Sequence, residues 1–113
     1  MIFVIDDDEI MAECVARATG KEARIFADAY MAMAAINEKL PEMIFLDILL
    51  TGPDGFTFLN ELASYVDTAK IPVVIISSLR FGGNDLSEYG VVGVLDKAEM
   101  VPGDIKRYVE QYC

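Results

Sequence analysis

Apolar residues in this chain gather in five short runs in which successive residues, rather than alternate ones, are hydrophobic. A strand that is covered on both faces has this pattern, and such strands are typical of parallel sheets. Turn-forming or acidic residues follow most of the runs and mark their ends. We therefore predict strands at residues 2–5, 23–26, 43–46, 71–76 and 91–95.

The segments between these runs carry apolar residues at helical spacing. Asp7 or Asp8 is placed to cap the start of the first helix, and Gly20 its end. The apolar face of this helix is predicted to consist of Ile10, Met11, Cys14, Val15 and Ala18. Two adjacent glycines interrupt the fourth helical segment, which we expect to be short. The other helices are predicted at residues 28–40, 55–65, 79–89 and 102–112.

The alternation of strands and helices predicts one α/β domain over residues 1–113. Right-handed crossovers between parallel strands place helices on both faces of the sheet. The expected architecture is a doubly wound, three-layer α/β/α sandwich built on a five-stranded parallel sheet. A chain of 113 residues is long enough to bury a single core without disulfides or structural metals.

Acidic residues outnumber basic ones by 19 to 9, and the net charge is −10. Nucleic-acid phosphates and anionic membrane surfaces require clustered Lys and Arg, so we expect neither as a partner. A divalent cation or a basic protein surface suits this charge better. No apolar run approaches the ~20 residues of a membrane-spanning helix, and the start lacks a signal-peptide pattern. The expected location is the cytoplasm.

Histidine is absent from the sequence, and there are two cysteines, Cys14 and Cys113. The absence of histidine excludes Ser-His-Asp and Cys-His catalysis and His-based zinc sites within the chain. Two cysteines are too few for a metal cluster or a disulfide framework. Because Cys14 falls on the predicted apolar helical face, we expect it to be a buried thiol.

Polar residues with reactive side chains follow four of the predicted strands. Because parallel strands end at one edge of a sheet, these residues should lie together there. A single Asp at a strand end is more often a turn or cap residue, and we assign Asp8 to that role. The residues that converge are Asp6, Asp7, Asp47, Ser77 and Lys97.

Three neighbouring carboxylates repel one another unless a cation neutralises them. Donors that are all oxygen, with no His or thiolate among them, suit Mg²⁺, which keeps several of its waters. Asp47 would supply a carboxylate nucleophile, Lys97 a positive charge and Ser77 a hydroxyl donor. Together these groups predict a site for phosphoryl transfer onto an aspartate.

These motifs resemble the receiver domain of bacterial two-component response regulators over essentially the whole chain. This chain has counterparts of the family's acidic pair after the first strand, its phosphoacceptor Asp and the Asp-Gly pair that follows the phosphoacceptor. It also has counterparts of the family's Ser/Thr after the fourth strand and its Lys after the fifth. The matching residues are Asp6, Asp7, Asp47, Asp54, Gly55, Ser77 and Lys97.

The resemblance implies a flavodoxin-like sheet with strand order 2-1-3-4-5 and a phosphoprotein of phosphorelay signal transduction. Asp47 would accept a phosphoryl group from a phosphohistidine on a sensor histidine kinase or phosphotransfer protein. Mg²⁺ would be held by Asp7, Asp47 and the backbone carbonyl of Leu49, with Asp6 assisting through water. Lys97 would contact the phosphoryl oxygens. The only reactions implied are the domain's own phosphorylation and dephosphorylation, so it would not be an enzyme in the wider sense.

In the same family, the Ser or Thr at the position of Ser77 moves to bond the phosphoryl group. This movement would remodel the face formed by the fourth helix, fifth strand and fifth helix. That face would bind a downstream protein whose identity the sequence does not give, and it also allows a homodimer.

The chain departs from the family pattern at three positions. Thr51 replaces a common Pro, and Val94 replaces the aromatic switch residue of the fifth strand. Ala98 follows Lys97 where the family has a Pro, often after a cis peptide bond. Because a cis bond before a residue other than Pro costs about 2.5–4 kcal/mol, we expect a trans bond here.

Two alternatives remain open at this point. One is a degenerate receiver that binds its partner independently of phosphorylation, as the departures at Thr51, Val94 and Ala98 suggest. The other is a small phosphatase similar to haloacid dehalogenases, because Asp6 to Asp8 contain an Asp-x-Asp pattern. The Gly-Thr pair and the late acidic pair expected of such a phosphatase are missing.

Overall fold

The computed structural model describes residues 1–48, 55–77 and 90–113. Its five strands form one parallel sheet in the order β2-β1-β3-β4-β5, which confirms the predicted fold class and strand order. The strands are β1 (Ile2–Ile5), β2 (Ala23–Phe26), β3 (Met43–Asp47), β4 (Val73–Ser77) and β5 (Val91–Asp96). The helices are α1 (Glu9–Ala18), α2 (Ala29–Glu38), α3 (Gly55–Ala63), α4 (Val66–Ala69) and α5 (Pro102–Tyr112).

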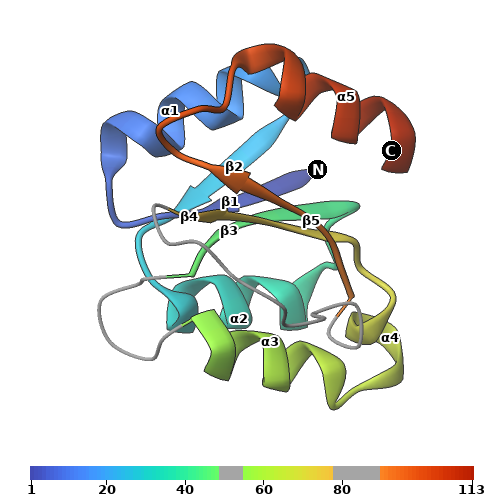
Figure 1. Cartoon of the computed structure of the whole chain (residues 1–113). Coiled ribbons are helices and arrows are strands. Elements are labelled where there is room, and N and C mark those ends of the chain that lie inside the picture. The colour runs from blue at the N-terminus through green and yellow to red at the C-terminus, as the bar shows by residue number, and fades with distance from the viewer. Residues whose placement is uncertain (49–54, 78–89) are drawn as a thin grey trace.

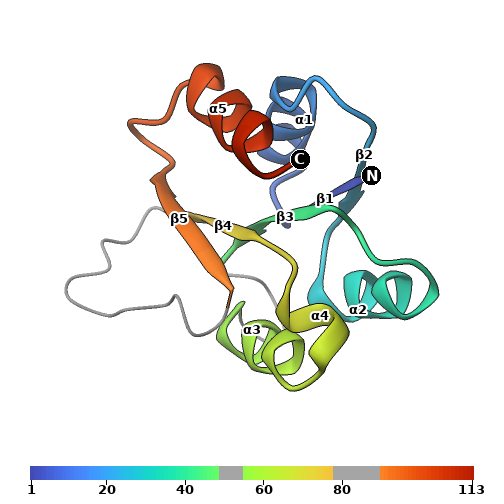
Figure 2. The same ribbon diagram turned by 90° about the vertical axis from the view of Figure 1, so that its right-hand side faces the viewer.

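Helices cover both faces of the sheet and make it the middle of three layers (Figures 1 and 2). Helices α1 and α5 lie on one face, and α2, α3 and α4 lie on the other. The side chains of β1 divide between the two resulting cores. Phe3 and Ile5 belong to the core under α2 and α3, whereas Ile2 and Val4 belong to the core under α1 and α5. Burial of successive residues on opposite faces explains the uninterrupted apolar runs.

Local polar contacts fix the helix ends that the sequence predicted. The carboxylate of Asp8 accepts a hydrogen bond from the backbone N–H of Met11, and Asp28 caps α2 through Met31 in the same way. Gly20 has φ of 69°, the left-handed conformation that ends a helix at low cost for glycine. In the described part of the chain, no helix combines the length and the hydrophobicity that crossing a membrane would require.

The apolar face of α1 is rotated by one residue from the predicted one. Ala12 and Val15 are buried, whereas Ile10 and Cys14 are exposed. The prediction that Cys14 is a core thiol was therefore wrong. The small side chain of Ala12 lets the helix lie close to the sheet, and the larger Ile10 is left at the surface.

The third predicted helix is shorter than expected, and a second, very short helix follows it. Helix α3 ends at Ala63, and the four-residue helix α4 leads into β4. The Thr68 hydroxyl donates to the Leu62 carbonyl at 2.5 Å and joins the two helices. The helix predicted at 79–89, together with Leu49 and Thr51, lies outside the described residues.

Gly93 makes room for an aromatic ring between β5 and α5. The register between β4 and β5 shifts by one residue at this point, so that Val73 pairs with Val91 and Val74 with Gly93. A Cβ atom on Gly93 would overlap the hydroxyl and ring of Tyr108. The glycine is therefore required for the close approach of α5 to the edge strand.

We expect Gly93→Ala to destabilise the protein by about 1–2 kcal/mol, because the Tyr108 ring must leave its position. Urea denaturation followed by circular dichroism would measure the loss. In a Tyr108→Ala background the same substitution should cost much less. An equal cost in both backgrounds would show that the ring does not set the requirement for glycine.

Candidate functional site

The candidate site lies at the edge of the sheet where the parallel strands end. Asp47 is the last residue of β3, the central strand, and Ser77 is the last residue of β4. Asp6 and Asp7 follow β1 directly, and Lys97 follows β5. Because β3 lies between β1 and β4, Asp47 has the acidic pair on one side and Ser77 on the other. The predicted convergence of these residues is therefore present in the fold.

The side chains of the acidic residues and Lys97 meet at this edge. Carboxylate oxygens of Asp6, Asp7 and Asp47 all lie within 4.8 Å of one another. The Lys97 Nζ donates a hydrogen bond to Asp47 Oδ2 at 3.2 Å and lies 3.5 Å from Asp6 Oδ2. A single ammonium group thus bridges two carboxylates from strands that are distant in sequence.

Burial strengthens the electrostatic interactions among these charges. The exposed fractions are 3% for Asp6, 5% for Asp47 and 21% for the Lys97 side chain. Water screens such groups poorly, so their charges must be matched by one another or by a bound ion. Asp7, in contrast, is exposed and faces solvent.

The pKa values of two groups report this environment. Burial and the nearby charge of Asp47 raise the pKa of Asp6 to about 6. Two contacts act in the opposite direction: the Asp8 N–H, which donates to Asp6 Oδ1 at 2.9 Å, and the charge of Lys97. Burial lowers the pKa of Lys97, but its hydrogen bond to Asp47 and the charge of Asp6 outweigh this and raise it above its ordinary value. Lys97 is therefore held in its charged form.

A tight turn after β5 positions Lys97. Its backbone N–H donates to the Ser77 carbonyl at 3.0 Å. The Asp96 carboxylate accepts from Ala98 N–H at 2.8 Å, and the Asp96 carbonyl accepts from Glu99 and Met100. The described residues include no cis peptide bond, so the bond before Ala98 is trans, as predicted. The sequence reasoning missed Asp96, although an Asp that bonds the backbone two residues later is a known turn signal.

The donor set fits a hard divalent cation. The three clustered carboxylates offer only oxygen atoms, and the exposure of Asp7 leaves room for the waters that Mg²⁺ retains. Both Asp6 oxygens already have partners, Asp8 N–H and Lys97 Nζ. This favours a supporting position for Asp6 rather than a direct bond to metal. Leu49, the predicted backbone ligand, lies outside the described residues.

Ser77 is buried and lies one strand from Asp47, because Asp47 pairs with Ile76 in the sheet register. The predicted hydroxyl donor therefore follows the residue that pairs with the predicted nucleophile, on the neighbouring strand. Its movement on phosphorylation stays a prediction. Val94, which occupies the position of the family's aromatic switch, is exposed on β5.

Two proteins with similar sequences are each longer than this chain. A protein-glutamate methylesterase/protein-glutamine glutaminase from Geobacter metallireducens is 27% identical over 97% of this chain and 32% of its own length. Response regulator PleD from Caulobacter vibrioides is 36% identical over 74% of this chain and 19% of its own length. The chain therefore spans less than a third of either relative.

Solved structures show the same fold at matching length. The receiver domain of NtrX from Brucella abortus is 31% identical, has a TM-score of 0.81, and covers 99% of this chain and 97% of that domain. The family model for the response regulator receiver domain matches residues 2–109. Since the match extends over nearly all of the sequence and the fold agrees, the chain belongs to the response regulator receiver domain family, a family of signalling domains.

Proposed function

We propose that residues 1–113 form a single receiver domain in which Asp47 is the phosphoacceptor of a two-component phosphorelay. The observation that carries this proposal is the contact of Lys97 with Asp47 at the centre of an acidic sheet edge. A structural carboxylate would have no need of two neighbouring acids and a partly buried ammonium group. A phosphoacceptor needs all of them, because negative charge accumulates when the phosphoryl group arrives.

The proposed reaction is an in-line transfer onto Asp47. One of its carboxylate oxygens attacks the phosphorus of a phosphohistidine on a sensor histidine kinase or phosphotransfer protein. A new phosphorus–oxygen bond forms as the phosphorus–nitrogen bond breaks, and the imidazole nitrogen leaves with the electron pair and is protonated. The product is an aspartyl phosphate. Lys97, which pairs with Asp47, would neutralise the phosphoryl oxygens.

Asp7 and Asp47 are the residues we propose as direct ligands of Mg²⁺, with the Leu49 carbonyl as a third and Asp6 acting through water. Bound Mg²⁺ would supply positive charge against the phosphoryl oxygens and screen the approaching donor. Asp6 also pairs with Lys97 and so would help to keep the ammonium group at the site. The compact acidic cluster supports this assignment.

We further propose that Ser77 reports phosphorylation to a partner-binding face that includes β5 and α5. Its hydroxyl would bond a phosphoryl oxygen, and its backbone carbonyl already accepts from the Lys97 N–H. A shift of Ser77 would therefore also move the turn that carries Lys97 and the end of β5. The downstream partner would be a protein, and the same face could pair two copies of the domain.

Incubation with acetyl phosphate and Mg²⁺ should add one phosphoryl group to the wild-type protein, and Asp47→Asn should add none. The physical reason is that the amide lacks the nucleophilic oxygen anion. Intact-protein mass spectrometry measures the addition. Asp28→Asn, which alters the cap of α2 instead, is the matched control and should phosphorylate normally.

The alternatives predict different results. A phosphorylation-independent interaction module would gain no phosphoryl group, or would bind its partner equally well with and without it. A phosphatase would turn over p-nitrophenyl phosphate with Asp6 as its nucleophile. The structure disfavours that role, because the Asp6 carboxylate is almost fully buried and both its oxygens are bonded. Turnover abolished by Asp6→Asn but not by Asp47→Asn would overturn the phosphoacceptor proposal.

A further inference from the structure

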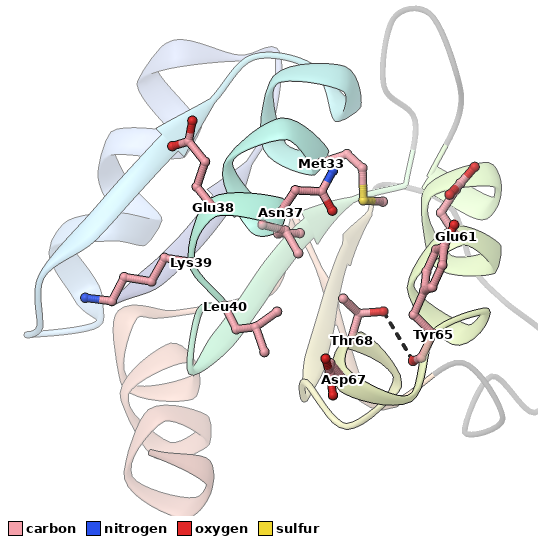
Figure 3. A pocket seen from close by; sticks show the side chains of 10 residues that line it. Met33, Asn37, Glu38, Lys39, Leu40, Glu61, Tyr65, Asp67 and Thr68 are labelled. Carbon is pink, nitrogen blue, oxygen red and sulfur yellow. Dashed lines mark hydrogen bonds between the residues drawn. The ribbon is translucent and has the colours of Figure 1, made fainter.

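A groove of about 340 Å³ opens between α2, α3 and α4 (Figure 3). It lies at the opposite edge of the sheet from Asp47, because α2 and α4 end just before β3 and β4 begin. The residues that matter for its chemistry are Met33, Leu40, Glu61, Tyr65, Asp67 and Thr68. None of them belongs to the phosphoacceptor site, so a function of the groove must be a separate one.

Apolar side chains that a monomer would normally bury line this groove. Leu40 is 46% exposed and Tyr65 is 62% exposed. Met33 and Leu40 extend from the α2 side toward α3 and α4 in Figure 3, and the buried Ile36 also lines the groove. Methionine adapts its shape to a bound surface, and tyrosine is frequent among residues that dominate binding energy. These are features of a docking surface.

The wall formed by α3 and α4 is held in place before any partner arrives. The buried Thr68 hydroxyl donates to the Leu62 carbonyl at 2.5 Å and lies 3.4 Å from the Tyr65 carbonyl (Figure 3). The Ala69 N–H donates to the same Tyr65 carbonyl at 2.9 Å. The backbone that carries Tyr65 is therefore fixed, which lowers the entropic cost of docking at this position.

The groove carries an excess of negative charge. Among the described residues that line it, three are carboxylates, Glu38, Glu61 and Asp67, and one is a cation, Lys39. Figure 3 shows the Lys39 and Glu38 side chains both pointing away from the cavity, so Glu61 and Asp67 are the carboxylates that remain beside it. Lys70, at the end of α4, does not line the groove. A partner must therefore bring positive charge.

A second cavity of about 290 Å³ continues the groove along α2 and α3. It shares Met33 and Glu61 with the first and adds the exposed ring of Tyr30, at the start of α2. The combined surface is an elongated trough between two helices. A trough of this shape accommodates a third helix better than a compact small molecule.

We propose that this trough docks a basic amphipathic helix of a protein partner. The apolar face of the helix rests on Met33, Leu40 and Tyr65, and Lys or Arg residues at its edges pair with Glu61 and Asp67. A second copy of the chain is a poorer occupant, because two molecules of net charge −10 repel each other. The site is independent of Asp47 and would work whether or not the domain is phosphorylated.

The test uses a synthetic amphipathic helix of about 18 leucine and lysine residues, about 27 Å long and thus long enough to extend past α2, whose ten residues span about 15 Å. Binding is measured by fluorescence anisotropy and mapped by amide chemical shifts in the isotope-labelled protein. Shifts should cluster around Met33, Leu40 and Tyr65. Tyr65→Ser and Leu40→Ser should each weaken binding about 5- to 10-fold. Val66→Ser, which removes a still more exposed apolar side chain that does not line the trough, should change it less than 2-fold.

The charges are tested separately from the apolar contacts. Glu61→Gln and Asp67→Asn should each weaken binding about 3-fold and reduce its salt dependence. Glu13→Gln, on α1 at the other face of the sheet, removes the same charge and should have no such effect. Asp47→Asn should bind the peptide as the wild type does, which separates this result from the phosphoacceptor proposal.

Three results would overturn the proposal. The first is no binding of the cationic peptide. The second is binding that maps to the acidic edge at Asp6 and Asp7 and is unaffected by Tyr65→Ser. The third is self-association in analytical ultracentrifugation that Leu40→Ser abolishes, which would assign the trough to a second copy of the chain.

Discussion

Replacement of Lys97 by Met should destabilise the metal-free protein by about 2–3 kcal/mol. The substitution keeps an unbranched side chain of similar length but leaves Asp6 and Asp47 without the ammonium group they share. Removing one partner of a buried ion pair costs about 3–5 kcal/mol, and the partial exposure of Lys97 reduces this figure. Urea denaturation in the presence of EDTA would measure the loss as a shift in midpoint at unchanged slope.

The matched control is Lys70→Met, which removes an exposed ammonium group at the end of α4. Its effect should stay within about 0.5 kcal/mol, as is usual for surface charges. Millimolar Mg²⁺ should return part of the stability lost in Lys97→Met, because a cation at the acidic cluster replaces the missing charge. If Lys97→Met is as stable as the wild type in EDTA, the ion pair contributes nothing and the electrostatic account of the site is wrong.

The sequence was sufficient to predict the sheet and the location of the site. Runs such as residues 43–46 are apolar at every position and admit few interpretations other than a strand buried on both faces. Once five such strands are parallel, their ends meet at one edge whatever the details of packing. The positions of Asp47, Ser77 and Lys97 followed from that geometry alone.

What the sequence did not predict depends on contacts between elements. The buried face of α1 is centred on Ala12 and Val15 rather than on Ile10 and Cys14, because the distance between helix and sheet selects the small residue. The overlap of Tyr108 with any side chain at position 93 occurs next to the register shift between β4 and β5. Neither feature leaves a periodic signal in the sequence.

The contact between Asp6 and Lys97 was also unforeseen. The resemblance to receivers assigned Asp6 to the metal and Lys97 to the phosphoryl group, and the structure joins the two residues in an ion pair. The trough between α2, α3 and α4 depends on α4, a single helical turn whose sequence has no distinctive period. Such short helices are positioned by contacts like that of Thr68 with Leu62 and cannot be read from hydrophobicity.

Three consecutive aspartates follow β1, and the structure gives each a different environment. Asp6 is buried and paired with Lys97, Asp7 is the exposed member of the acidic cluster, and Asp8 caps α1. The metal role we propose for Asp7 and the cap of Asp8 can therefore be separated by substituting one residue at a time. The measured quantity is the gain in thermal stability on adding Mg²⁺, with phosphate donors absent.

Asp7→Asn should abolish most of the Mg²⁺-dependent stabilisation. At a Mg²⁺ concentration about 100 times the dissociation constant, the wild type should gain about 2.7 kcal/mol, because the ion binds only the folded state. An amide in place of the exposed carboxylate removes one charged ligand and should weaken binding enough to leave little of that gain. Differential scanning calorimetry with and without Mg²⁺ would measure it.

Asp8→Ala should show the opposite pattern. Loss of the cap bond to Met11 should lower stability by about 1 kcal/mol both with and without Mg²⁺, while the gain on adding Mg²⁺ stays that of the wild type. Loss of the Mg²⁺ response in Asp7→Asn, together with its retention in Asp8→Ala, would show that Asp7 is the residue that binds the cation. If Asp7→Asn retains the full Mg²⁺ shift, the acidic cluster does not bind the metal through Asp7, and the proposed ligand set is wrong.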